Sequence, residues 1–174
     1  MKKVLFIAAV ALFGLGKASA QETTYGLTAG FHSLTASVSG SGINVSDSAS
    51  GFFAGFFIDF NVSEKFNIQP EIQFASTYKD GENGSMIIIP IMAKYYVSDK
   101  FNVQAGPQFD LVLDDSERLN KLGFGLGFGV GYDFSEKLFS AARYSIGLNN
   151  RIEDAPSDMS AKLDTFQIGL GYRF

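Results

Sequence analysis

Apolar residues alternate with small or polar residues along most of this chain after Thr24. The clearest run is LGFGLGFGVGYDF at 122–134, in which leucine, phenylalanine, valine and tyrosine occupy every second position. Glycines and Asp133 fill the other face of the same run. FNIQPEIQFAST at 66–77 and TFQIGLGYRF at 165–174 follow the same pattern. A period of two indicates β-strands with two different faces, so the pattern predicts an all-β fold.

Short turns of the pattern Ser-Glu/Asp-Lys divide the alternating segments at nearly equal intervals. They consist of Ser63, Glu64, Lys65, Ser98, Asp99, Lys100, Ser135, Glu136 and Lys137. The connections between these turns are longer and polar: SGSGINVSDSAS, YKDGENGS, DDSERLNK and NNRIEDAPSDMSA. We therefore predict an eight-stranded antiparallel up-and-down β-barrel with short turns at one rim and long loops at the other. The predicted strands span 24–37, 51–62, 66–77, 86–97, 101–113, 122–134, 138–148 and 162–174.

Residues 1–20 have the composition of a cleavable signal peptide. A basic start at Lys2 and Lys3 precedes the apolar run Val4–Gly16, and Ala18-Ser19-Ala20 forms a small-x-small cleavage site. This run is shorter than the ~20 residues that a membrane-spanning helix needs. We predict export of the chain and a barrel domain over 21–174. Because the sequence contains no cysteine, we expect neither disulfides nor a lipidated cysteine anchor.

Alternation alone does not decide whether the apolar face points into the barrel or out of it. Charged residues are largely excluded from that face, and the opposite face is mostly glycine, serine, threonine, asparagine and glutamine. Such small and polar residues suit the narrow lumen of an eight-stranded barrel better than a solvated outer surface. Aromatic residues gather beside the short turns, as they do at membrane interfaces: Phe60, Phe66, Tyr95, Phe101, Tyr132, Phe134, Tyr172 and Phe174. We predict a transmembrane barrel with its apolar face toward lipid.

Several motifs in order resemble the PorT-like outer-membrane β-barrel family of Bacteroidota, a family of small barrels. They are IQPEIQF (68–74), IPIMAKYY (89–96), AGPQFDL (105–111), GFGLGFGVGYDF (123–134) and IGLGYRF (168–174). The resemblance covers nearly all of 21–174. It implies an outer-membrane barrel with periplasmic termini and short turns, extracellular loops and no assigned enzymatic activity. Tyr172 and Phe174 in the terminal GYRF look like the signal that the barrel-assembly machinery recognises.

These observations lead to expectations about partners. Outer-membrane lipid and, during biogenesis, the barrel-assembly machinery are the expected partners, and we expect a monomer without a cofactor. A net charge of −4 at pH 7 argues against nucleic acid. The sequence indicates no particular extracellular partner. The leading function is a structural or interaction-mediating barrel that acts through its loops.

Isolated charges on the lumen face suggest how the barrel is filled. Glu71 and Arg143 lie at similar positions along strands that start at the same rim, on opposite walls. We predict that Glu71, Arg143 and Lys94, with Asp110 and Arg173, form an ion-pair network that plugs the lumen. The alternative is water-bridged charges in a narrow wet core. A small-solute channel is therefore the second candidate function.

A lipid-modifying enzyme is the third candidate. The single histidine, His32, falls on the lumen face, but the adjacent Ser33 faces the other way, so the two do not form a nucleophile–base couple. We predict a plain polar lumen residue at His32.

Two further features have structural interpretations. Pro70, Pro90 and Pro107 fall inside predicted strands, where we expect β-bulges or local twist. Acidic residues in the third and fourth long loops lack the ligand order of a calcium site, so we predict solvated loops. They are Asp114, Asp115, Glu117, Glu153, Asp154 and Asp158.

Overall fold

A computed structural model describes residues 23–40, 43–114, 120–152 and 159–174. The predicted signal peptide lies outside these described residues. The same is true of the acidic loop residues Asp115, Glu117, Glu153, Asp154 and Asp158.

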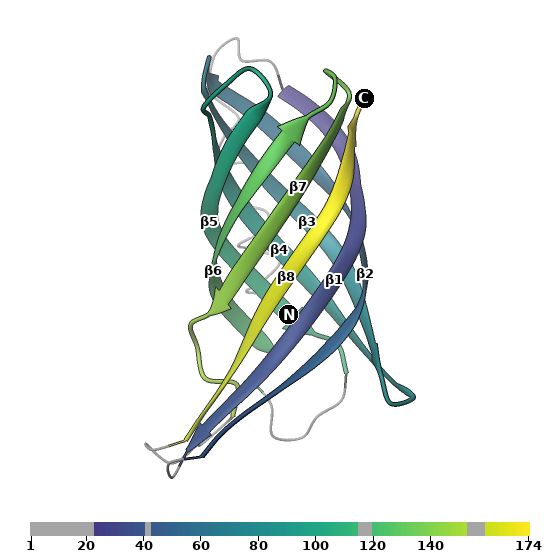
Figure 1. Ribbon diagram of the computed structural model, residues 1–174, viewed down its shortest axis with the longest axis vertical. Helices are drawn as coiled ribbons and strands as arrows, with labels where there is room; N and C mark the ends of the chain where they lie inside the picture. The colour runs from purple at the N-terminus through teal and green to yellow at the C-terminus, as the bar shows by residue number, and fades with distance from the viewer. Residues whose placement is uncertain (1–22, 41–42, 115–119, 153–158) are drawn as a thin grey trace.

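Eight strands form a closed antiparallel barrel in which every strand pairs with its neighbours in the chain and β8 pairs with β1. Figure 1 shows the strands tilted around the barrel axis. The strands are β1 (Thr23–Gly40), β2 (Ile43–Ser63), β3 (Phe66–Lys79), β4 (Glu82–Tyr96), β5 (Phe101–Val112), β6 (Leu122–Asp133), β7 (Leu138–Gly147) and β8 (Ser160–Arg173). The predicted fold class is confirmed. No helix within the described ranges is long and apolar enough to cross a membrane.

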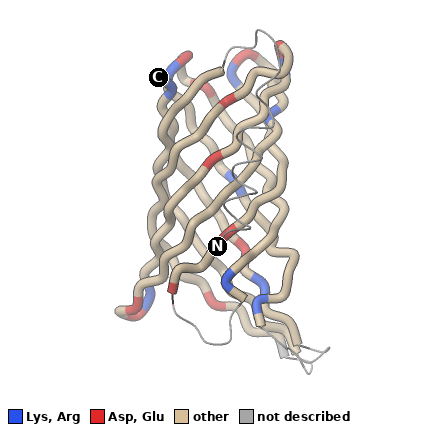
Figure 2. The backbone as a smooth tube through the Cα atoms, turned by 180° about the vertical axis from the view of Figure 1, so that it is seen from behind, with Lys and Arg blue, Asp and Glu red and all other residues tan. Residues whose placement is uncertain are grey.

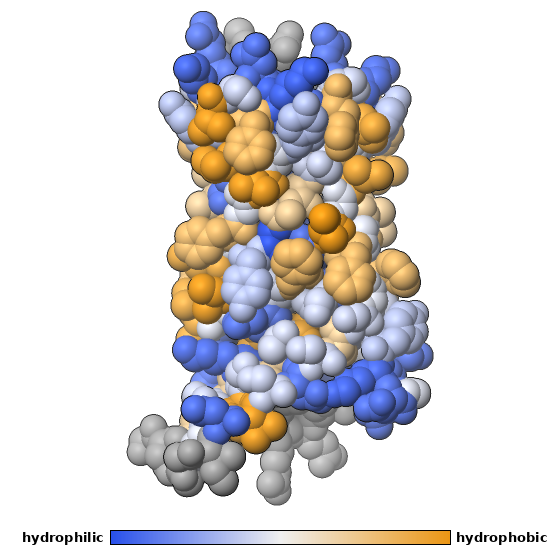
Figure 3. Space-filling model, in the orientation of Figure 1, coloured by the Kyte–Doolittle hydropathy of each residue, from blue (hydrophilic) through white to orange (hydrophobic). Residues whose placement is uncertain are grey.

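The apolar face of the strands points outward. Phe52 and Phe174 are 69% and 67% exposed, whereas the lumen-facing Glu71 and Lys94 are 4% and 1% exposed. Figure 3 shows apolar side chains gathered between two hydrophilic rims. In Figure 2 many of the charged residues lie toward the two ends of the barrel. The barrel therefore has the surface that a bilayer requires, with an apolar band between two polar rims.

On β8 the outward apolar band ends before the strand reaches the rim opposite the short turns. Asp164 lies on the outward phase of β8, two residues before Phe166. The hydroxyl of Tyr144, on the neighbouring strand, donates to Asp164 Oδ2 at 2.9 Å. A tyrosine that packs its ring on the apolar band and directs its hydroxyl toward a carboxylate is typical of a membrane interface.

The first predicted long loop is largely strand. β1 pairs with β2 without interruption from Thr23↔Phe60 to Gly40↔Ile43. Hydroxyl pairs at 3.0 Å join Thr35 to Ser48 and Ser37 to Ser46 on the outer face of this extension. The prediction of a loop was wrong because serine, asparagine and glycine weaken the apolar alternation, while paired hydroxyls still stabilise the ribbon.

The second predicted long loop is a tight hairpin turn. β3 and β4 pair up to Lys79↔Glu82, which leaves Asp80 and Gly81 as the turn. Both residues have positive φ, 49° and 86°, as in a type I′ turn. The expectation that every tight turn lies at the same rim was therefore wrong.

The three in-strand prolines produce no bulge. Ladder pairs are missing beside Pro70, Pro90 and Pro107, but the register before and after each gap is the same. The register shift between β2 and β3 lies instead at Asn61/Ser63, next to the short turn. Each proline removes one donor from the ladder without adding a residue, so the strands continue in register.

Candidate functional site

The lumen is asymmetric, with long polar side chains on one wall and glycine on another. β3 directs Asn67, Gln69, Glu71 and Gln73 inward, while the inward positions of β6 between Gly123 and Gly131 are all glycine. A Cβ atom at Gly129 would lie 2.7 Å from Cγ of Arg143, and contacts this short are not tolerated. Because these positions carry no side chain, the polar side chains occupy the space beside the glycine wall.

Glu71 and Arg143 form an ion pair across the lumen. Arg143 Nη1 lies 2.6 Å from Glu71 Oε1. Glu71 also accepts hydrogen bonds from Gln69 Nε2 at 2.7 Å and from Gln73 Nε2 at 2.6 Å. Arg143 Nε donates to Gln104 Oε1 at 2.8 Å. Both charges are thus paired and further bound by amide side chains, the condition for keeping charges inside a protein.

Lys94 joins this centre through an amide rather than directly. Its Nζ lies 2.5 Å from Asp59 Oδ2 and donates to Gln69 Oε1 at 2.7 Å. Gln69 in turn donates to Glu71, and Asn67 Nδ2 donates to Asp59 Oδ1 at 2.9 Å. We call the connected set the lumen network: Asp59, Asn67, Gln69, Glu71, Gln73, Lys94, Asn102, Gln104, Arg143 and Gln167.

Asp110 and Arg173, the other two predicted members, belong to separate pairs. Asp110 binds Arg151, which follows β7 in a segment predicted as loop and also donates to the carbonyl of Asn120. Arg173 Nη2 lies 2.8 Å from Asp133 Oδ1. Its guanidinium carbon lies 4.5 Å from the centroid of the Phe139 ring. Within the described part of the chain, the lumen charges therefore form three separate groups rather than one.

His32 has no polar partner among the described residues. It is fully buried on the lumen face, and within this part of the chain neither ring nitrogen has a hydrogen bond. The Ser33 hydroxyl lies on the other side of β1 and donates to the carbonyl of Ala49 at 3.5 Å. The two side chains therefore lack the mutual contact that a nucleophile and base need.

The short turns connect β2 to β3, β4 to β5 and β6 to β7 at the rim where β8 also ends (Figure 1). We call this the short-turn rim and the other end the long-hairpin rim. The Ser98 hydroxyl accepts a hydrogen bond from the amide of Phe101 at 3.1 Å, and Ser135 accepts one from Leu138 at 3.1 Å. These contacts explain serine at the first position of the turns at 98–100 and 135–137. Tyr172 and Phe174 lie on the outer face there, with ring centroids 5.9 Å apart.

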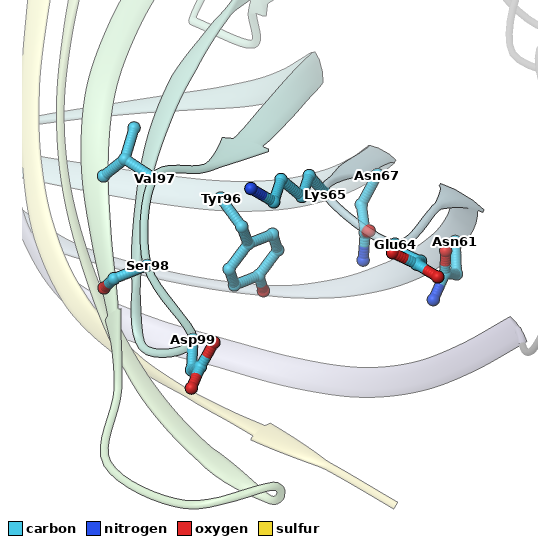
Figure 4. A pocket seen from close by; sticks show the side chains of 8 residues that line it. All are labelled: Asn61, Glu64, Lys65, Asn67, Tyr96, Val97, Ser98 and Asp99. Atoms are coloured by element: carbon cyan, nitrogen blue, oxygen red, sulfur yellow. The ribbon is translucent and has the colours of Figure 1, made fainter.

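Described residues line open basins at the rims and a much smaller cavity at mid-lumen. The basin at the short-turn rim has a volume of ≈ 650 Å³. Figure 4 shows the residues that line it: Asn61, Glu64, Lys65, Asn67, Tyr96, Val97, Ser98 and Asp99. At mid-lumen a cavity of ≈ 10 Å³ touches Thr28, Arg143 and Gln167. That volume is about the size of one water molecule.

A family model described as outer membrane protein beta-barrel domain matches residues 5–174. The chain belongs to this outer-membrane β-barrel family. The finer PorT-like assignment stays a prediction. No protein of curated function matches the chain.

Several solved structures are similar to this outer-membrane barrel. Neisserial surface protein A has 16% sequence identity and a TM-score of 0.52, with 88% of this chain and 99% of that chain covered. Ail of Yersinia pestis has 16% identity and a TM-score of 0.49 over 88% and 99% of the two chains. OprG of Pseudomonas aeruginosa has 14% identity and a TM-score of 0.49 over 88% and 97%.

Proposed function

We propose that this outer-membrane barrel is a non-enzymatic, non-conducting anchor that holds its long-hairpin rim outside the cell. The observation that carries the proposal is the lumen network, which connects β3 to β7 across the barrel through the Glu71–Arg143 pair. β3 and β7 are four strands apart in an eight-stranded barrel, so they lie on opposite walls. The ion pair therefore spans the full width of the lumen.

An ion that crossed this lumen would have to separate buried, charge-assisted hydrogen bonds. Each such bond contributes about 1.5–3 kcal/mol, and the interior of an eight-stranded barrel is just filled by its side chains. The contacts of Glu71 and Arg143 leave a water-sized cavity beside Arg143. The lumen therefore favours a closed barrel over a solute path.

Orientation forms part of the proposal. β1 begins and β8 ends at the short-turn rim, as the pair Gly26↔Arg173 indicates. We assign this rim to the periplasm, because an exported chain reaches the outer membrane from that side and its ends need not cross. The barrel-assembly machinery would then meet Tyr172 and Phe174 from the periplasm.

Planar-bilayer conductance of the refolded protein tests the closed lumen. A heat-modifiable gel shift first establishes that the barrel is folded. We expect the wild type to be silent and the double variant Glu71→Ala/Arg143→Ala to conduct, because removing both side chains leaves the glycine wall facing an open gap. A stable wild-type conductance that changes on Arg143→Ala would overturn the proposal and favour a small-solute channel, which the polar, glycine-rich lumen also suits.

A further inference from the structure

β2 has an open edge at the long-hairpin rim. Its pairing with β3 ends at Ser50↔Tyr78, whereas its pairing with β1 continues to Gly40↔Ile43. Over 44–49 no strand within the described residues covers the side of β2 that faces away from β1. Figure 1 shows the β1–β2 ribbon and the β3–β4 hairpin diverging at this end of the barrel.

The hydrogen bonds of the ribbon show which backbone groups face the open side. The carbonyl of Ala49 accepts the Ser33 hydroxyl, so it points toward β1. Because successive residues of a strand direct their amide and carbonyl to opposite sides, those of Ser46 and Ser48 point away from β1. The Ser48 amide donates to Asp47 Oδ1 at 3.1 Å, a contact within its own strand.

The basin beside this edge is acidic. It has a volume of ≈ 450 Å³ and contains one cation, Lys79, among its described lining residues. Lys79 forms an ion pair with Asp47 across the gap, with the two side chains 36% and 67% exposed. The hydrogen bond from Lys79 is the main cause that lowers the pKa of Asp47. The acidic residues that line the basin are Asp47, Asp80, Glu82 and Asp114.

A solvent-exposed ion pair of this kind is weak and easily displaced. Beside it, Val45 is 58% exposed on the same face of β2 as Asp47, while Ser46 and Ser48 occupy the opposite face. One face of this edge therefore carries an apolar side chain, Val45, followed by a carboxylate, Asp47. Backbone donors and acceptors that point to the open side lie along the same edge.

We propose that the β2 edge over 44–49 binds an extended basic peptide segment of a partner protein by strand addition. The segment places an apolar side chain against Val45 and a lysine or arginine beside Asp47, where it displaces Lys79. Backbone hydrogen bonds supply the affinity and these side chains the selectivity. The inference rests on the proposed function, because it takes the long-hairpin rim as the surface through which the barrel acts.

Charge argues for such a partner and against a second copy of the chain. Two copies joined edge to edge would bring their acidic basins together, and the chain carries a net charge of −4. Charged side chains near a free edge are a common device against pairing with an identical edge. A basic segment has the opposite charge and meets no such repulsion.

The test uses full-length barrel, refolded in mild detergent, and a blocked, fluorescent peptide of sequence Thr-Val-Thr-Lys-Thr-Val-Thr. This sequence is palindromic, so it fits the edge in either direction. We expect saturable binding by fluorescence anisotropy, and much weaker binding of a matched peptide with glutamate in place of lysine. Asp47→Asn should raise Kd about tenfold, as expected for the loss of one charge-assisted hydrogen bond.

Ser46→Pro separates strand addition from simple charge attraction. This substitution removes an amide that faces the open side, so we expect it to abolish binding while the heat-modifiable gel shift persists. Ser37→Ala, on the outer face of β1, is the matched control and should bind like the wild type.

Unchanged binding to Ser46→Pro, equal binding of the two peptides, or no binding at about 1 mM peptide would overturn the proposal. So would peptide-independent dimers at the same edge, because the second copy would then be the occupant. Conductance of the same samples reports on the closed lumen separately, since a silent barrel that binds no peptide contradicts only this inference.

Discussion

The Glu71–Arg143 pair shows how single residues make the lumen a specific structure. Glu71 has contacts with one guanidinium and two amides, and Arg143 has a further amide partner. Such a pair contributes little net stability compared with apolar packing, but either charge without its partner is costly. The pair should therefore behave as a unit.

Arg143→Met removes the cation and leaves Glu71 buried, so we expect the free energy of unfolding to fall by about 3–5 kcal/mol. The double variant Glu71→Gln/Arg143→Met should recover part of that loss, because no uncompensated charge remains. The measurement is urea unfolding in lipid vesicles, followed by the fraction of heat-modifiable barrel. Lys79→Met, which breaks an exposed pair, is the matched control and should leave stability almost unchanged. Equal losses in the single and double Arg143 variants would show that the unpaired charge of Glu71 is not the source of the loss.

The sequence predicted the lumen positions of these residues better than their partners. A period of two places Glu71, Lys94 and Arg143 on the inner face, but it does not say which residue lies across the lumen at the same height. Lys94 pairs with Asp59, and Asp110 pairs with Arg151 from a segment predicted as loop. The amides that connect the charges carry no distinguishing pattern. They become visible when the strand registers are known.

At the scale of elements, the barrel follows from alternation, whereas the hairpins beyond the membrane band do not. All eight strands were predictable because lipid imposes apolar residues at the outward positions, which are every second residue along a strand. Outside the band this requirement ends, so the extensions of β1, β2, β3 and β4 are mostly polar or small residues with a few apolar ones, such as Val38 and Val45. The Asp-Gly pair at 80–81 is the local signal of a type I′ hairpin in the sequence, within a polar stretch that resembles a loop.

Gly81 tests this account of the β3–β4 hairpin. Its φ is +86°, and no atom of the described residues lies within 4 Å of the position of an added Cβ atom. Gly81→Ala should therefore lower the free energy of unfolding by about 1–2 kcal/mol through backbone conformation alone, without a clash. Asp80→Asn keeps a residue that tolerates positive φ and should leave stability unchanged within about 0.5 kcal/mol. Urea unfolding of both variants measures the difference, and a neutral Gly81→Ala would mean that the turn adopts another type.

The whole molecule has two unlike ends on either side of one apolar band. The short-turn rim carries tight serine-capped turns and the end of β8, while the long-hairpin rim carries a three-stranded extension of β8, β1 and β2. The tight turns protrude little beyond the apolar band at the short-turn rim. The extension carries strand backbone and charged side chains beyond that band at the long-hairpin rim. This asymmetry suits a barrel that is inserted from one side and acts on the other.

The absence of cysteine from the sequence makes the orientation directly measurable, since any thiol introduced is unique. Ser46→Cys places a thiol on the β2 extension, and Asp99→Cys places one in an exposed short turn. With a membrane-impermeant maleimide on intact cells, we expect labelling of the Ser46 variant and none of the Asp99 variant, because the outer membrane shields the periplasm from the reagent. Both variants should label after lysis, which controls for reactivity. The reverse pattern would place the long-hairpin rim in the periplasm. The basic partner of the β2 edge would then have to be a periplasmic protein, and the barrel could not act as an extracellular anchor.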